Sequence, residues 1–159
     1  MLMRNHGLKN RNESLIWGTN SRLDNLQAGF GNIMLKKIDK WNKIQLNIAK
    51  HYSRNLKNLV EIPEYDLNIS NPSFHQYIIK VKYRNKLKNY LKKNGIDTAI
   101  HYPIPIHRQK AFKKQYGTIK LPKTEFYSNK ILSLPINPYL KKREVDFIIK
   151  KIKQFYNES

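Results

Sequence analysis

Cysteine is absent from this sequence of 159 residues. A disulfide scaffold and a zinc site built on thiolates are therefore excluded, and a reducing compartment is permitted. Long apolar runs are also missing, since none approaches the roughly 20 residues that a membrane-spanning helix needs. The first ten residues, MLMRNHGLKN, lack the apolar core of a signal peptide. We therefore expect a cytoplasmic protein that does not bind a membrane.

Acidic residues are scarce, with 11 Asp and Glu against 31 Lys and Arg, which gives a net charge of +20. Such an excess favours a polyanionic partner. However, 24 of the 31 basic residues are Lys and only 7 are Arg, and Arg supplies most of the forked contacts of specific base recognition. We therefore expect no specific nucleic-acid binding. A non-catalytic basic module that binds nucleic acid or anionic surfaces remains the alternative function.

Several motifs of catalysis are also missing. The sequence contains no phosphate-binding glycine loop, no nucleophile elbow and no dinucleotide fingerprint. None of its carboxylates pairs convincingly for acid–base work. Any chemistry must therefore come from less familiar combinations of residues.

The pattern that is present begins at Asn20. From there to Leu59, apolar residues recur every three or four positions without a proline. This spacing predicts one helix of about 35 residues, capped by Asn20 or Ser21. A helix of that length suggests a connection between two bodies.

Strand and helix patterns alternate after residue 73. Strands are predicted at 74–83, at 96–102 and from residue 131 to the prolines that follow. Helices are predicted at 84–94, 107–117 and 124–131, and an amphipathic one ends the chain, marked by Glu144, Val145, Ile148, Ile149, Ile152, Phe155 and Tyr156. The order predicts an α+β (α/β) fold, a small sheet covered by helices.

The stretch GIDTAIHYPIPIHRQ, residues 95–109, carries the most unusual composition. Pro103 and Pro105 fix φ and remove two N–H donors, so the chain must leave the sheet as a stiff loop. His101, Tyr102 and His107 on such a loop are candidate binding residues for a sugar or a phosphate. Ordinary polar residues on a stiff loop would give the same pattern. A metal site is not expected, because the two histidines lack the usual ligand spacing.

Three further features of the sequence have structural or functional interpretations. Asn20, in GTNSRLD, is either a helix cap or part of a phosphate site at a helix N-terminus, which Arg22 would strengthen. His75 is interpreted as structural. Trp17 and Trp41 are interpreted as core or interface residues.

Four segments together resemble one known family: RNHG…WGTNSRLDNLQAGF, KIDKWNKIQLNIAKHYSRNL, FHQYIIKVKYRNKLKNYLKKNGIDTAIHYPIPIHRQKAF and LPKTEFYSNKILSLPINP. In order and spacing they are similar to the C-terminal portion of the DegT/DnrJ/EryC1/StrS sugar aminotransferases. That resemblance implies the pyridoxal-phosphate (PLP) fold type I, as in aspartate aminotransferase. It also implies amino transfer to a nucleoside-diphosphate keto sugar, in amino-sugar or polysaccharide synthesis.

The resemblance assigns roles to particular residues. It implies that Asn20 reaches the cofactor phosphate, often across a homodimer interface. It implies that His101 and Tyr102 lie near the sugar nucleotide, with His107 as a further candidate. The long helix would join the cofactor domain to the small domain. The implied division is 1–19 as a remnant of the large cofactor domain, 20–60 as the linking helix and 61–159 as the small domain.

The family's Schiff-base lysine lies in a segment upstream of RNHG, so no catalytic residue is assigned in this chain. We expect a truncated gene product, one piece of a split gene or a fragment of a longer open reading frame, whose partner is a second copy, as in the family's homodimers, or a complementary N-terminal chain. Alone, it is expected neither to bind PLP nor to catalyse transamination. Phe30, Ile33, Met34 and Trp41 are expected to be exposed without the large domain, which favours self-association.

Overall fold

The computed structural model describes residues 2–21 and 23–157. The chain divides into two compact units, Met1–Asp39 and Lys40–Ser159. The boundary therefore falls inside the segment for which one linking helix was predicted. No helix within the described residues is both long enough and apolar enough to span a bilayer.

The first unit begins with a loop that closes on itself through backbone bonds. Asn5 and Asn20 form an isolated antiparallel bridge, and Ser21 N–H donates to the carbonyl of Arg4 at 2.9 Å. Gly7 and Gly18 permit this closure. A Cβ on Gly7 would lie 1.7 Å from the Ile16 carbonyl oxygen, and one on Gly18 would lie 2.5 Å from the Gly7 nitrogen.

The predicted continuous helix from Asn20 is wrong in two respects. Helix α1 spans Asn25–Leu35 and helix α2 spans Ile38–Leu56, with a turn between them. In that turn, Lys37 N–H donates to the Met34 carbonyl at 2.9 Å. The apolar spacing of four from Met34 to Ile38 continues across the turn, so periodicity alone conceals the break. Neither Asn20 nor Ser21 caps a helix, and Arg22 lies outside the described residues.

The second unit is built on a two-stranded antiparallel sheet. Strand β1 spans Tyr77–Lys80 and strand β2 spans Ile131–Leu134, with Tyr77 opposite Leu134 and Lys80 opposite Ile131. The strand predicted at 96–102 is reduced to a single bridge between Ala99 and Ser133. Pro103 and Pro105 lack N–H groups, so no strand could continue past residue 102.

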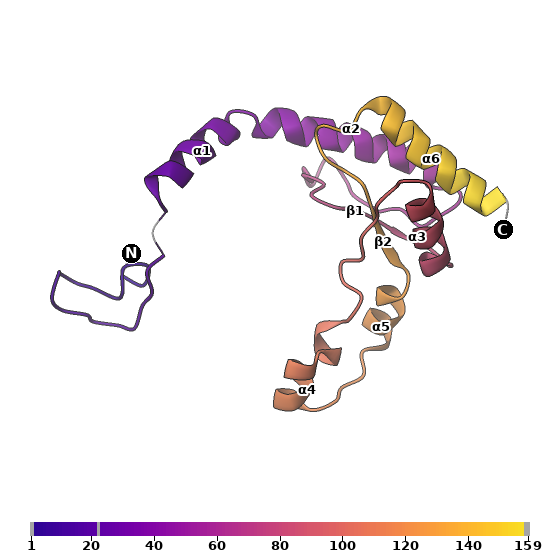
Figure 1. Cartoon of the computed structure of the whole chain (residues 1–159). Coiled ribbons are helices and arrows are strands. Elements are labelled where there is room, and N and C mark those ends of the chain that lie inside the picture. Colours follow the sequence, from indigo (N-terminus) through magenta and orange to yellow (C-terminus); the bar gives the residue numbers. More distant parts are fainter. Residues whose placement is uncertain (1, 22, 158–159) are drawn as a thin grey trace. The chain divides into compact units, whose positions relative to one another are not determined.

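Helices cover this sheet (Figure 1). Besides α2, they are α3 (Arg84–Lys93) and α6 (Lys142–Asn157), which contact each other. The 3₁₀ turn η1 (Ile106–Arg108), α4 (Lys110–Tyr116) and α5 (Pro122–Ser128) belong to an excursion that leaves the sheet after residue 100 and returns at β2.

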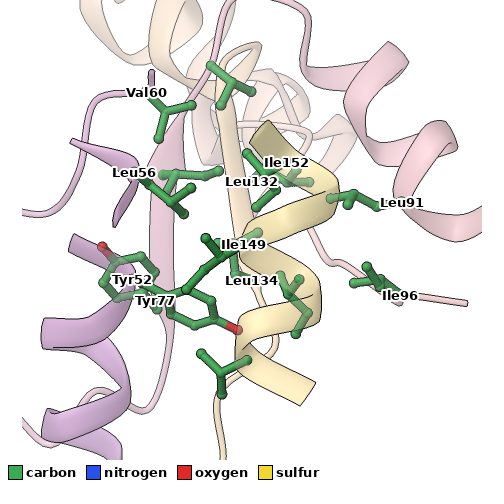
Figure 2. Packing of buried hydrophobic residues seen from close by; sticks show 14 of the residues in the cluster. Tyr52, Leu56, Val60, Tyr77, Leu91, Ile96, Leu132, Leu134, Ile149 and Ile152 are labelled. Atoms are coloured by element: carbon green, nitrogen blue, oxygen red, sulfur yellow. The ribbon is translucent and has the colours of Figure 1, made fainter. Parts of the chain in front are cut away.

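The core lies between the sheet, α2, α3 and α6 (Figure 2). Tyr77 and Ile79 of β1 are fully buried, as their alternation predicts. Of the residues predicted to mark α6, Glu144 is exposed and Tyr156 is partly buried. The buried ones are Val145, Ile148, Ile149, Ile152 and Phe155. The structure thus has the predicted α+β fold class, with two strands where three were expected.

Candidate functional site

His101 and Tyr102 lie where the chain leaves the Ala99–Ser133 bridge. The His101 Nδ1 atom lies 2.8 Å from the Ser133 hydroxyl oxygen, so β2 anchors the start of the stiff loop. Tyr102 is 71% exposed, and its ring meets the His101 ring edge-on at 5.5 Å between centroids. The sheet therefore holds the imidazole, while the phenol projects from the protein surface.

An open pocket of about 700 Å³ lies beside these two residues. We call it the loop pocket. One wall is the loop of residues 101–109. The opposite wall comes from α4, from the segment before α5, and from α5 and β2; its residues are Phe112, Ile119, Leu121, Thr124, Tyr127, Ser128 and Ile131.

The lining of the loop pocket is mainly apolar, with polar groups at a few positions. These groups include the His101 imidazole, the Tyr102 phenol and the Gln109 amide. Apolar walls with few placed polar groups are typical of small-molecule sites. Rings on both walls, such as those of Tyr102 and Tyr127, can stack on a flat ligand group.

The described residues of this pocket do not fit PLP on their own. Covalent attachment of that cofactor needs a lysine amine, and its pyridine nitrogen needs a charged partner. Among the described residues, neither a lysine nor a carboxylate lines the loop pocket. The arrangement can bind and orient a ligand, and it contains no group for imine chemistry.

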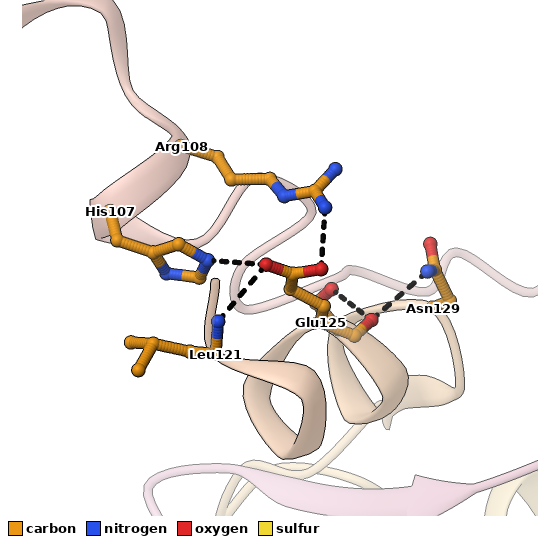
Figure 3. Close-up of polar contacts among 6 residues, drawn as sticks. His107, Arg108, Leu121, Glu125 and Asn129 are labelled. Carbon is orange, nitrogen blue, oxygen red and sulfur yellow. Dashed lines mark hydrogen bonds and ion pairs between the residues drawn. The ribbon is translucent and has the colours of Figure 1, made fainter. Parts of the chain in front are cut away.

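His107 is more deeply buried than His101 and Tyr102. Its side chain is only 3% exposed, and its Nε2 lies 3.0 Å from Oε1 of Glu125. Figure 3 shows that Arg108 reaches the other carboxylate oxygen of Glu125, while the Leu121 N–H donates to Oε1 at 3.2 Å. His107 lines part of the pocket, but its ring is bonded to Glu125, which does not line the pocket.

These three donors lower the pKa of Glu125 to about 2, the hydrogen bond from His107 contributing most. Sequence reasoning did not single out Glu125. A weak signal was present, because Glu125 follows Pro122 at the start of a helix, where carboxylates accept backbone N–H bonds. Nothing in the local sequence indicated its pairing with residues 107 and 108.

The remaining candidates lie elsewhere. Asn20 is exposed in the first unit, in the backbone bridge with Asn5. Trp17 is 99% exposed, whereas Trp41 is partly buried against the Tyr139 ring at 6.3 Å. His75 is exposed beside a smaller pocket that also includes His101 and Asp97. The described residues contain no group of three His, Asp or Glu side chains able to hold a metal ion.

Comparison with known proteins gives a consistent answer. Residues 1–153 match the DegT/DnrJ/EryC1/StrS aminotransferase family. The dTDP-3-amino-3,6-dideoxy-alpha-D-galactopyranose transaminase of Aneurinibacillus thermoaerophilus is 33% identical over 155 residues. That alignment covers 97% of this chain and 42% of the relative, so the chain spans less than half of the relative's length.

Solved structures agree with this relationship. A DegT DnrJ EryC1 StrS aminotransferase from Brucella abortus superimposes with a TM-score of 0.90 at 32% identity, covering 98% of this chain and 42% of its own. NtdA from Bacillus subtilis, bound to its cofactor PMP, superimposes with a TM-score of 0.88 at 28% identity. That superposition covers 98% of this chain and 38% of NtdA. The fold is therefore part of PLP fold type I, and the chain belongs to the PLP-dependent DegT/DnrJ/EryC1/StrS aminotransferase family.

Proposed function

We propose that this chain is the C-terminal portion of a sugar-nucleotide aminotransferase and that it supplies part of the substrate site. The observation that carries the proposal is the loop pocket, with His101 and Tyr102 on its wall. A relative that covers nearly the whole chain is named as a transaminase of a dTDP-linked amino sugar. The substrate class we propose is accordingly a nucleoside-diphosphate keto sugar.

The proposed roles follow from the chemistry of the half-buried His101 and the exposed Tyr102. With Nδ1 of His101 engaged by Ser133, the Nε2 atom is available to exchange a hydrogen bond with a sugar hydroxyl or a phosphate. The Tyr102 phenol can donate a hydrogen bond, and its ring can stack on a base. The high positive charge of the chain favours the approach of a diphosphate.

Asn20 is proposed to hydrogen-bond the cofactor phosphate through its side-chain amide, as the resemblance implies. The exposure of Asn20 is compatible with a contact to a second polypeptide. The reactive lysine is proposed to lie outside these 159 residues. Either the second subunit of a homodimer or a complementary N-terminal chain would complete the site. PLP supplies the electron sink for amino transfer when it is bound in such a site.

The test is calorimetric titration of the chain with dTDP-glucose. Tyr102→Ala should weaken binding about tenfold, equivalent to about 1.4 kcal/mol, because a stacking ring and a hydroxyl donor are lost. Tyr139→Ala is the matched control, since Tyr139 is 74% exposed and does not line the loop pocket. The control should bind as the wild type does. Equal losses in both variants, or no binding by the wild type, would refute the proposal.

A further inference from the structure

The carboxylate of Glu125 lies outside the loop pocket and accepts hydrogen bonds from residues of both of its walls. The first wall contributes His107 and Arg108, both in the 3₁₀ turn η1, and the second contributes the backbone N–H of Leu121. Glu125 itself does not line the loop pocket and instead lines a smaller pocket on the other side. It therefore acts on the pocket only through the residues that it holds.

The rest of the loop has few other polar attachments. Within the described part of the chain, the hydrogen bonds and ion pairs that link side chains of residues 102–108 to segments beyond the loop all end on Glu125. The backbone bonds of Arg108 and Gln109 stay inside the loop, where they go to the carbonyls of Pro105 and Ile106. At its start, the loop is tied to β2 through His101 and Ser133.

The stiffness of the loop makes this second attachment important. Pro103 and Pro105 fix two φ angles, so the loop has little freedom to bend internally. Among the described residues, the 3₁₀ turn η1 that follows these prolines is closed only by the two backbone bonds of Arg108 and Gln109, so the bonds from His107 and Arg108 to Glu125 hold the turn closed and keep the far end of the loop in place. The bond to buried His107 should matter most, because a buried imidazole needs a partner and the exposed Arg108 pair is screened by water.

We propose that Glu125 is a positioning residue that holds the 101–109 loop against the start of α5 and thereby sets the width of the loop pocket. This inference rests on the proposed function, because the bound molecule is taken to be the sugar nucleotide. Glu125 needs no contact with that molecule. Its removal should let the η1 turn open, so that the far end of the loop, with Ile104 and Ile106, moves away from the opposite wall.

The chain offers a matched control in Glu144. Its carboxylate accepts the Lys141 N–H at 2.7 Å at the start of α6, much as Glu125 accepts the Leu121 N–H at the start of α5. Glu144 does not line the loop pocket. Glu144→Gln and Glu144→Ala therefore weaken a comparable helix start without touching the loop.

The experiment compares amide hydrogen exchange in the wild type, Glu125→Gln, Glu125→Ala and the two Glu144 variants. We expect the amides of Arg108 and Gln109 to exchange about tenfold faster in Glu125→Ala and at an intermediate rate in Glu125→Gln, which keeps one acceptor oxygen for His107. In both Glu144 variants these amides should exchange as in the wild type, and faster exchange should be confined to the α6 start.

A second readout is the dissociation constant for dTDP-glucose. We expect it to rise about tenfold in Glu125→Ala and to stay at the wild-type value in Glu144→Ala. Unchanged exchange at Arg108 and Gln109 in Glu125→Ala would overturn the inference, because Glu125 would then be only a helix cap. Faster exchange together with no wild-type binding of dTDP-glucose would instead remove the proposed function and leave the loop attachment in place.

Discussion

At the scale of single residues, the loop holds its three candidate side chains in different surroundings: His101 is bonded to Ser133, Tyr102 is exposed, and His107 is buried against Glu125. The prolines beside His101 and Tyr102 drew attention to this pair, whose role in binding stays a prediction. The burial of His107 was not identifiable, since its partner Glu125 lies 18 residues further along the chain. Local patterns do not encode such a pairing, which depends on how α5 returns beside the loop.

The low pKa of Glu125 has a consequence for stability. Because its pKa falls from 4.5 to about 2 on folding, its contribution is complete above pH 4.5 and is lost as the pH falls towards about 2. The difference in unfolding free energy between the wild type and Glu125→Gln should therefore be constant near neutral pH and shrink across this acid range. Urea unfolding at a series of pH values measures it.

The control repeats the urea unfolding series with His107→Gln added to both the wild type and the Glu125→Gln variant. The hydrogen bond from His107 is the largest cause of the lowered pKa, so the pH-dependent part of the difference should shrink in that background. If the difference in unfolding free energy between the wild type and Glu125→Gln instead grows as the pH falls, that result would contradict the placement of the donors around Glu125.

At the scale of elements, amphipathic patterns were informative where one face of a helix meets a core. Most of the residues predicted to mark α6 are buried, because burial on one side enforces the 3.6-residue period, although Glu144 is exposed. Element ends were less predictable. The interruption between α1 and α2 preserves the apolar spacing, and the single Ala99–Ser133 bridge replaces a strand whose composition looked suitable.

The packing of α6 on the sheet can be tested by truncating Ile152, which is fully buried in the core. Ile152→Ala should lower the unfolding free energy by about 2–5 kcal/mol, because it leaves a cavity that the close-packed surroundings cannot fill. Lys150→Ala, at an exposed position of the same helix, should change it by less than about 0.5 kcal/mol. Similar losses in the two variants would show that the helix is docked in a different register.

Helix α1 differs from α6, because none of its described residues is buried. Phe30, Ile33 and Met34 are 61%, 56% and 51% exposed, as the sequence predicted. Trp41, predicted to be exposed with them, is instead partly buried against Tyr139. A surface of this kind favours association. We expect light scattering to show concentration-dependent self-association, which Phe30→Ser with Ile33→Ser should reduce. A monomer at all concentrations would contradict this expectation.

At the scale of the whole molecule, the family could be inferred from the order and spacing of four segments, and the comparisons confirm it. The relation between the two units and the remainder of a complete active site could not be inferred, since the chain spans about 42% of its relatives. The interpretation as remnant, linking helix and small domain stays a prediction.

The 159-residue chain should not catalyse transamination by itself. Mixed with PLP, glutamate and a dTDP-linked keto sugar, it should form no amine and no internal-aldimine absorption band, because the pocket residues described contain no lysine. Addition of a polypeptide that carries the cofactor domain should restore amine formation. Amine formation by the chain alone would show that the reactive lysine is present within it.

The central claim is that the loop pocket receives a sugar nucleotide. The most direct measurement is a footprint, namely amide hydrogen exchange of the chain with and without saturating dTDP-glucose. The account predicts slower exchange in residues 101–109 and in α5, with little change in α3 and α6. Protection confined to the lysine-rich helices α3 and α6, or protection nowhere, would contradict it.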